Sequence, residues 1–226
     1  MYPLLENVLW NSLNSEHARF SVGTVNARRY ARGFSPILGF ADPEQPDFAA
    51  IASYCDPGEH YYCADWSGSV PAGWQLDAES TMFRMVYAGS MAGADQALDA
   101  VPLTAVHAAQ ALALAKLTNP GPFGIRTIEL GDYFGYFAED QLIAMAGERM
   151  HAGSLREISG VCTHPDHQGR GYARRLIDKL LLRQLQRGQQ PFLHVMSAND
   201  SAHALYLRMG FVDHHEPVVR VVSLAP

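Results

Sequence analysis

Residues 168–173 read Gln168-Gly169-Arg170-Gly171-Tyr172-Ala173, and their position in the chain makes them decisive for the fold. They join a predicted strand, Leu155 to Thr163, to a predicted helix, Gly171 to Gln186. A glycine-rich turn that enters a helix leaves several backbone N–H groups unpaired, and the helix dipole favours an anion beside them. Gly169 and Gly171 allow a close backbone approach, and Ala173 keeps the helix start clear. The stretch therefore predicts a site for a phosphate-bearing ligand.

The residues of this loop leave the kind of ligand open. Two glycines before a helix can serve turn geometry alone. No Gly-Lys-Ser/Thr follows, as it does in the Walker phosphate loop, and the dinucleotide fingerprint needs three glycines at fixed offsets. A phosphate-bearing ligand of another kind has to be considered.

Regular elements surround the loop from Ala94 onward. The predicted helix after the loop is amphipathic, with Leu176, Ile177 and Leu180 on one face at helical spacing. Thr104 is a plausible helix N-cap, and a short polar turn at residues 138–140 predicts a hairpin. The other predicted strands are Leu98 to Leu103, Tyr133 to Phe137, Leu142 to Ala146, Phe192 to Met196 and Val218 to Ser223, and the other predicted helices are Ala105 to Leu117 and Ser201 to Met209. This alternation predicts an α/β sheet with helices on its faces.

The first ninety residues differ from the rest of the chain in composition and in how few regular elements they predict. They hold all three tryptophans, many turn formers and only short apolar runs, with one clear strand prediction at Thr81 to Tyr87. We therefore predict a division into a smaller unit or N-terminal extension, residues 1–90, and a larger domain, residues 97–226.

Composition excludes several classes of protein. A formal charge of −6 argues against nucleic-acid binding, and no stretch is long and apolar enough to cross a membrane. The first ten residues lack the pattern of a secretory signal, and three cysteines cannot form a fully paired disulfide framework, so we expect a cytoplasmic protein with free thiols. Neither Cys55-x4-His60-x2-Cys63 nor the pair His164 and His167 has a standard zinc spacing, so we predict no metal.

Two motifs together resemble the GNAT superfamily of N-acetyltransferases. Residues 168–173 match its pattern Gln/Arg-x-x-Gly-x-Gly/Ala, which binds the acetyl-CoA pyrophosphate in that superfamily. About thirty residues downstream, its pattern Asn-x-x-Ala-x-x-Leu-Tyr-x-x-x-Gly-Phe is matched by Asn199, Ala202, Leu205, Tyr206, Gly210 and Phe211. The resemblance covers residues 97–226. It implies the GNAT fold, a mixed, mostly antiparallel sheet flanked by helices, with residues 1–90 as an extension or a degenerate half of the same fold.

The resemblance also implies an activity, the transfer of an acetyl group from acetyl-CoA to a primary amine of a small molecule or peptide. The residues that it assigns to acetyl-CoA are Val161, Cys162, Thr163, Gln168, Gly169, Arg170, Gly171, Tyr172, Ala173 and Asn199. Because the family uses direct transfer, Cys162 is not expected to form an acyl-enzyme.

Three residues are candidates for proton transfer. The resemblance makes Tyr206 the acid that protonates the departing thiolate and places Glu157 as a base that acts through water. That role requires a raised pKa, and the alternative is a glutamate paired with Arg156 or Arg149. His194 lies where relatives carry a catalytic carboxylate, and its alternative is a packing role.

The acceptor is the least determined part. We expect it near the hairpin, the N-terminal extension and the last strand, where the candidate residues are Tyr133, Phe134, Tyr136, Glu148, His151, His214 and His215. Acyl groups longer than acetyl and a homodimer remain open. The competing functions are a catalytically silent acyl-CoA-binding sensor or scaffold, and a phosphate-binding enzyme of another family.

Overall fold

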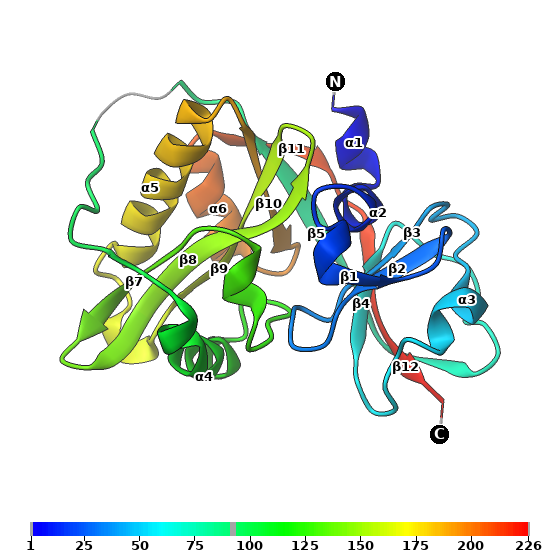
Figure 1. The fold of residues 1–226 in the computed structure, drawn as a ribbon. Coiled ribbons are helices and arrows are strands. Elements are labelled where there is room, and N and C mark those ends of the chain that lie inside the picture. The colour runs from blue at the N-terminus through cyan, green and yellow to red at the C-terminus, as the bar shows by residue number, and fades with distance from the viewer. Residues whose placement is uncertain (1, 91–93, 226) are drawn as a thin grey trace.

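The computed structural model describes residues 2–90 and 94–225, which form a nine-stranded sheet and a smaller three-stranded sheet (Figure 1). The N-terminal elements are α1 (Pro3–Glu6), α2 (Val8–Asn14), η1 (Ala18–Phe20), β1 (Ser21–Gly23), β2 (Ala27–Tyr30), β3 (Leu38–Phe40), α3 (Phe48–Ala52), β4 (Tyr61–Ala64) and β5 (Trp74–Tyr87). The elements that follow are β6 (Val101–Pro102), η2 (Ala105–His107), α4 (Ala108–Thr118), η3 (Thr127–Leu130), β7 (Tyr133–Ala138), β8 (Gln141–Ala152), β9 (Leu155–Thr163), η4 (Pro165–His167), α5 (Tyr172–Gln186), β10 (Gln190–Met196), α6 (Asp200–Arg208), β11 (Phe211–His215) and β12 (Val218–Leu224).

The large sheet is mixed and mostly antiparallel. Its strands run in the order β4-β12-β5-β10-β9-β8-β7-β6, and β11 pairs with β5 beside this path. Within the described residues, β9 and β10 are its one parallel pair of neighbouring strands. Helices flank the sheet, so the predicted fold class is confirmed (Figure 1).

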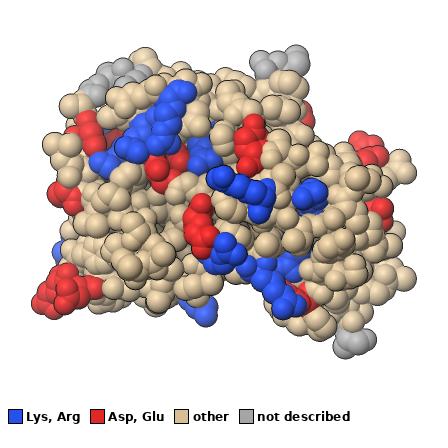
Figure 2. All heavy atoms as spheres, in the orientation of Figure 1, with Lys and Arg blue, Asp and Glu red and all other residues tan. Residues whose placement is uncertain are grey.

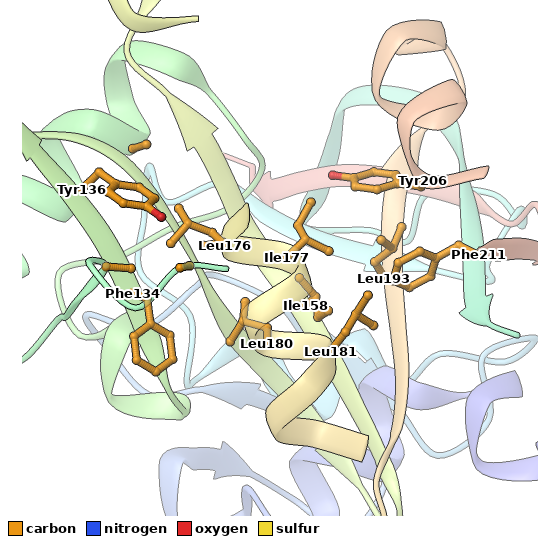
Figure 3. Packing of buried hydrophobic residues seen from close by; sticks show 14 of the residues in the cluster. Phe134, Tyr136, Ile158, Leu176, Ile177, Leu180, Leu181, Leu193, Tyr206 and Phe211 are labelled. Atoms are coloured by element: carbon orange, nitrogen blue, oxygen red, sulfur yellow. The ribbon is translucent and has the colours of Figure 1, made fainter. Parts of the chain in front are cut away.

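Side chains of the sheet alternate between two helix-covered faces. On β8, Ala144 and Ala146 pack in one cluster with α5, whereas Met145 packs in another with α4. Figure 3 shows the first cluster, in which Leu176, Ile177, Leu180 and Leu181 of α5 lie against Ile158 of β9 and Leu193 of β10. On the other face, α2 contributes to a third cluster with Met150 of β8. The centre of the sheet is therefore covered from both sides.

The structure differs from the predicted elements at several places, one of which is β5, which begins at Trp74 instead of Thr81. The strand expected over Leu98 to Leu103 is reduced to β6, because only two of its residues pair with β7. The strand predicted at Leu142 to Ala146 continues to Ala152 as β8, and β11 was not predicted. The first turn of the helix after Thr104 is a 3₁₀ helix, capped through a reciprocal bond with His107, before α4 begins.

Strand β5 joins the two parts of the chain in one sheet. Its first half pairs with the C-terminal strand β12, and its second half pairs with β10 on one side and β11 on the other. In Figure 1 the C-terminal strand, drawn red, runs among the blue and cyan elements of the first ninety residues. The division predicted near residue 90 therefore runs through a continuous sheet.

Arg84 of β5 connects this sheet to the N-terminal helices. Its side chain is fully buried; Nη2 donates to Asp65 Oδ2 at 2.8 Å and Nη1 donates to the Leu5 carbonyl at 2.8 Å. Its Nε donates to His194 Nε2 of β10 at 3.2 Å. A buried guanidinium needs such partners, because an unpaired buried charge is costly.

We predict that Arg84→Met lowers the free energy of unfolding by about 3 kcal/mol or more, because removal of one partner leaves the Asp65 carboxylate without its cation. Urea denaturation followed by circular dichroism measures the loss. The matched control is Arg32→Met, whose side chain is 80% exposed and pairs with Asp56; its effect should be far smaller, because exposed ion pairs contribute little. Because β5 is shared, we expect one transition for every protein. Two transitions, with only one shifted by Arg84→Met, would contradict this.

Candidate active site

Strands β9 and β10 separate halfway along their length. They pair from Leu155 and Gln190 to Ile158 and Leu193. Beyond that point β10 continues to pair only with β5, from His194 to Met196. The β9 edge facing this gap is released from the ladder, and unpaired strand edges present free N–H and C=O groups. The separation opens a passage through the middle of the sheet.

A bulge in β9 lies beside this passage. Ser159 pairs with Gly147 and Cys162 pairs with Met145, so Gly160 and Val161 both face the single residue Ala146. Such a bulge leaves backbone groups outside the ladder. Gly160 has φ +63°, and a Cβ there would stand 3.2 Å from the Tyr133 ring. Glycine is therefore required at this position by both conformation and space.

A cavity of about 390 Å³ occupies the opening and passes through the sheet. On the side of α6 its wall includes Asn199, Ala202 and Tyr206, and on the side of α2 it includes Leu9 and Arg149. The remaining lining residues are Ile37, Tyr62, Cys63, Ala64, Ala78, Glu79, Ser80, Met82, Asn119, Pro120, Gly121, Pro122, Met150, Ile158, Ser159, Gly160, Val161, His194, Val195, Met196, Val219 and Val221.

This cavity contains some of the predicted site residues and not others. Val161, His194, Asn199 and Tyr206 line it, whereas Cys162 and Thr163 continue β9 beyond it and Glu157 lies buried beside it. The seven residues expected near the acceptor do not line it: Tyr133, Phe134, Tyr136, Glu148, His151, His214 and His215. Glu148 instead is buried in an ion pair with Arg156 at 2.9 Å. The cavity wall opposite α6 is supplied by the N-terminal elements and β12.

The loop before α5 has the backbone geometry of an anion site. Gly169 has φ +74° and Gly171 has φ +79°, and a Cβ at either would meet no atom within 4 Å, so glycine is required by conformation rather than by space. No side chain caps α5, whose first backbone bond runs from Arg175 N to the Gly171 carbonyl. The N–H groups of residues 172–174 therefore have no acceptor within the helix.

Basic residues along α5 are paired with acidic ones. Figure 2 shows blue and red side chains interleaved in the region of α5 rather than a basic face. The pairs are Arg174 with Asp178, Arg175 with Asp99, Lys179 with Asp95, and Arg183 and Arg187 with Asp132.

Tyr206 presents a protonated hydroxyl at the cavity. The residue is 8% exposed, and burial raises its pKa to about 12. Within residues 2–90 and 94–225 the hydroxyl has no hydrogen-bond partner, and Figure 3 shows it directed away from α6. At neutral pH the hydroxyl is therefore protonated and can act as a proton donor.

Asn199 has an amide group that a ligand can bind, whereas Cys162 is a buried, protonated thiol. Asn199 begins α6, and its Oδ1 accepts from Ala202 N at 3.1 Å, so its amide NH₂ is left for a ligand in the cavity. Burial raises the pKa of Cys162 to about 11, so its thiol is protonated at neutral pH and unsuited to nucleophilic attack.

Glu157 is held as a carboxylate by four donors. Its Oε2 accepts from Arg149 Nε at 2.9 Å and from Met150 N at 3.2 Å. Its Oε1 accepts from Arg149 Nη2 at 2.7 Å and from His194 Nδ1 at 2.8 Å. Burial alone raises the pKa of Glu157, but the charge of Arg149 and these bonds outweigh it and lower the pKa below its ordinary value. A base needs the opposite shift, and four donors fill the acceptor positions of a carboxylate.

His194 is also fully engaged. Its Nε2 faces Arg84 Nε, which can only donate, so this ring nitrogen accepts and the proton lies on Nδ1, toward Glu157. Burial lowers the pKa of His194, and the neighbouring Glu157 offsets only part of that effect. The ring is therefore neutral and has no free lone pair for a substrate. Asp65, Arg84, His194, Glu157 and Arg149 form one continuous buried network.

Sequence reasoning missed Arg84 and Asp65, and it named Arg149 only as a pairing partner. The available signal was a single arginine within the apolar strand residues 82–86. Among the residues that the structure describes, no group of three or more His, Cys, Asp or Glu could hold a metal ion, and His60 bonds to Asp77. No described helix is long and apolar enough to cross a membrane.

Comparison with known proteins identifies this architecture. The family model described as FR47-like protein matches residues 133–219. A solved structure named as a GNAT-family acetyltransferase from Novosphingobium aromaticivorans DSM 12444 is 30% identical, with 98% of this chain and 99% of that chain covered and a TM-score of 0.88. Comparison with curated proteins gave no match.

Two more distant structures share the fold alone. A GCN5-related N-acetyltransferase from Kribbella flavida is 14% identical, with 99% of this chain and 96% of that chain covered and a TM-score of 0.61. A GCN5-related N-acetyltransferase-like protein from Streptococcus suis 89/1591 is 13% identical, with the same coverage and a TM-score of 0.62.

The chain belongs to the GNAT family. It is an enzyme of the acyltransferase class. Membership of this family argues against a phosphate-binding enzyme of another family.

We predict that Glu157→Gln lowers the free energy of unfolding by about 3 kcal/mol at neutral pH, because Arg149 loses its buried counter-charge. The native pKa of Glu157 lies below the unfolded value of about 4.3, so its contribution is present above that pH and is lost as the pH falls toward the native pKa. The difference from wild type should therefore shrink in acid. Urea denaturation between neutral and acidic pH measures this, and Glu129→Gln, at an exposed ion pair, is the control. A difference that grows on acidification would show that the native pKa is raised.

Proposed function

We propose that the protein transfers an acetyl group from acetyl-CoA to a primary amine. The observation that carries this proposal is the single cavity through the sheet, with Tyr206 and Asn199 on one side and a mostly apolar wall on the other, called the chamber below. The proposal includes a cytoplasmic location and no metal, as the sequence predicts.

The residues present fit acetyl-CoA. The unpaired N–H groups at the start of α5, with Gly169 and Gly171, would hold the pyrophosphate. The Asn199 amide and the released backbone of residues 161–163 would meet the pantetheine arm and the thioester. When bound, acetyl-CoA supplies a thioester whose C–S bond breaks as the amine nitrogen forms the new C–N bond, with one proton lost from nitrogen and one taken up by sulfur.

Tyr206 would supply the proton for the sulfur, because its phenol stays protonated and unpaired beside the opening. We assign Glu157 and His194 a positioning role instead of the base role that the resemblance implies. Both are occupied by each other, by Arg149 and by Arg84. The amine proton would then pass to water in the cavity.

We predict that acetyl-CoA raises the thermal midpoint of the wild-type protein, because a ligand that binds only the native state stabilises it. Gly171→Glu should abolish the shift, since it places a carboxylate where the pyrophosphate would bind. Differential scanning fluorimetry measures both.

The control is Gly188→Glu at the other end of α5, where φ is +69° and a Cβ would also meet no atom within 4 Å. This variant carries comparable backbone strain and should retain the shift. No shift in the wild-type protein at about 100 times a micromolar Kd would contradict the cofactor assignment.

We predict that Tyr206→Phe lowers kcat by about 10²-fold or more, the usual worth of a positioned acid, and leaves the thermal shift with acetyl-CoA intact. Release of free CoA thiol with an accepted amine measures the rate. Tyr136→Phe, a buried tyrosine of the same cluster that does not line the cavity, is the control. Equal rates for Tyr206→Phe and wild type would remove Tyr206 from the mechanism.

A further inference from the structure

The acceptor side of the cavity is a mostly apolar chamber. Its walls come from α2, β4, β5, β8, β12 and the loop before β3, and they bring together Leu9, Ile37, Tyr62, Met82, Met150 and Val219. Burial of apolar side chains against such walls is favourable, whereas a charged group there would lose its hydration without a partner. The chamber therefore favours an acceptor with an apolar body.

Arg149 is the cation that borders this chamber. Its side chain is 9% exposed, and its Nε and Nη2 are both used by Glu157. Over the part of the chain that the structure describes, Nη1 has no acceptor, although the residue lines the cavity. This nitrogen is not enclosed by protein atoms, and because the residue lines the cavity, the donor is available to a ligand there. The free Nη1 therefore points to a ligand atom that accepts a hydrogen bond.

A guanidinium donor favours a carboxylate as that acceptor. Arg84 and Arg149 carry two positive charges, which Asp65 and Glu157 balance, and His194 is neutral. A charge-assisted bond from a guanidinium to a carboxylate is stronger than one to a neutral oxygen. Glu79, on the same cavity wall, already pairs with Arg220 Nε at 2.6 Å.

We infer that the acceptor is a free α-amino acid with an apolar side chain, such as leucine, methionine or phenylalanine. Its carboxylate receives the Nη1 hydrogen bond of Arg149, and its side chain lies in the chamber beside Leu9, Ile37 and Met82. The amine, one carbon from the carboxylate, is then directed toward the opening between β9 and β10. This inference rests on the proposed acetyl transfer.

The decisive comparison uses acceptors that differ in one group. L-leucine is compared with leucinamide and 3-methylbutylamine, which lack the carboxylate, with glycine, which lacks the side chain, and with spermidine. Release of CoA thiol from acetyl-CoA gives kcat/KM for each. We expect L-leucine to exceed 3-methylbutylamine and glycine by about 10-fold or more, the usual worth of a charge-assisted hydrogen bond or of a buried apolar side chain.

Arg149→Lys tests the residue itself. Lysine keeps a positive charge beside Glu157 but has no second terminal nitrogen to offer the ligand. The ratio of kcat/KM for L-leucine over leucinamide should fall about 10-fold, mainly through KM. Arg156→Lys is the matched control, because Arg156 is in an equally buried pair with Glu148 at 2.9 Å and does not line the cavity. It should leave the ratio unchanged.

A binding measurement keeps the test independent of turnover. Isothermal titration calorimetry with N-acetyl-L-leucine and with N-(3-methylbutyl)acetamide should show that only the first binds, and that Arg149→Lys weakens it.

Several outcomes would overturn the inference. These are preference for the decarboxylated amine, preference for spermidine, or an unchanged ratio in Arg149→Lys. If acetyl-CoA raises the thermal midpoint but none of the apolar amino acids releases CoA, the acceptor class is wrong and the cofactor assignment stands. If acetyl-CoA itself gives no shift, the proposed function fails first.

Discussion

The buried carboxylate of Glu157 is the charge around which the centre of the molecule is organised. It lies at 0% exposure, where an isolated charge would be unstable, and four donors from β8 and β10 hold it. One of those donors, His194, is in turn fixed by Arg84 of β5. The network therefore connects β8, β9, β10 and β5 across the place where the sheet opens. The two sides of the cavity are held at a defined separation by this network as well as by backbone pairing.

The opening lies where β10 keeps one of its two neighbouring strands and loses the other. Phe192 and Leu193 of β10 pair with β9 on one edge and with β5 on the other, but from His194 onward β10 pairs only with β5. The bulge at Gly160 and Val161 turns β9 in the same region, so the two strands part without leaving the sheet. Because β5 also carries β11 and β12, the N-terminal part of the chain is needed to form the cavity. It supplies both the strand that pairs with β10 along the opening and much of the apolar chamber wall.

Local patterns were sufficient to predict α5 and α6, the helices to which the proposed function assigns acetyl-CoA. The helix spacing of Leu176 to Leu181, the two glycines before it and the spacing of Asn199 to Phe211 are all short-range features, and α5 and α6 are present where they predict. The opposite side depends on contacts between residues far apart in the sequence, such as Arg84 with Asp65 and His194. No periodicity reports such contacts. For the same reason the seven residues expected near the acceptor lie elsewhere, since the chamber is built from β4, β5, β12 and α2.

The two faces of the cavity differ in what they can do with protons. On the side of α6, the phenol of Tyr206 is protonated and has no partner within the described residues, so it is available to donate. On the side of α2, each titratable atom of Glu157 and His194 is already bonded, and within the described residues Arg149 Nη1 is a donor of this network without an acceptor. A network with no vacant lone pair cannot accept a proton without breaking a buried ion pair, at a cost of several kcal/mol. In the proposed mechanism, acid chemistry at the leaving group is therefore separate from recognition of the acceptor, and Glu157 acts by holding Arg149 and His194 in place rather than as a base.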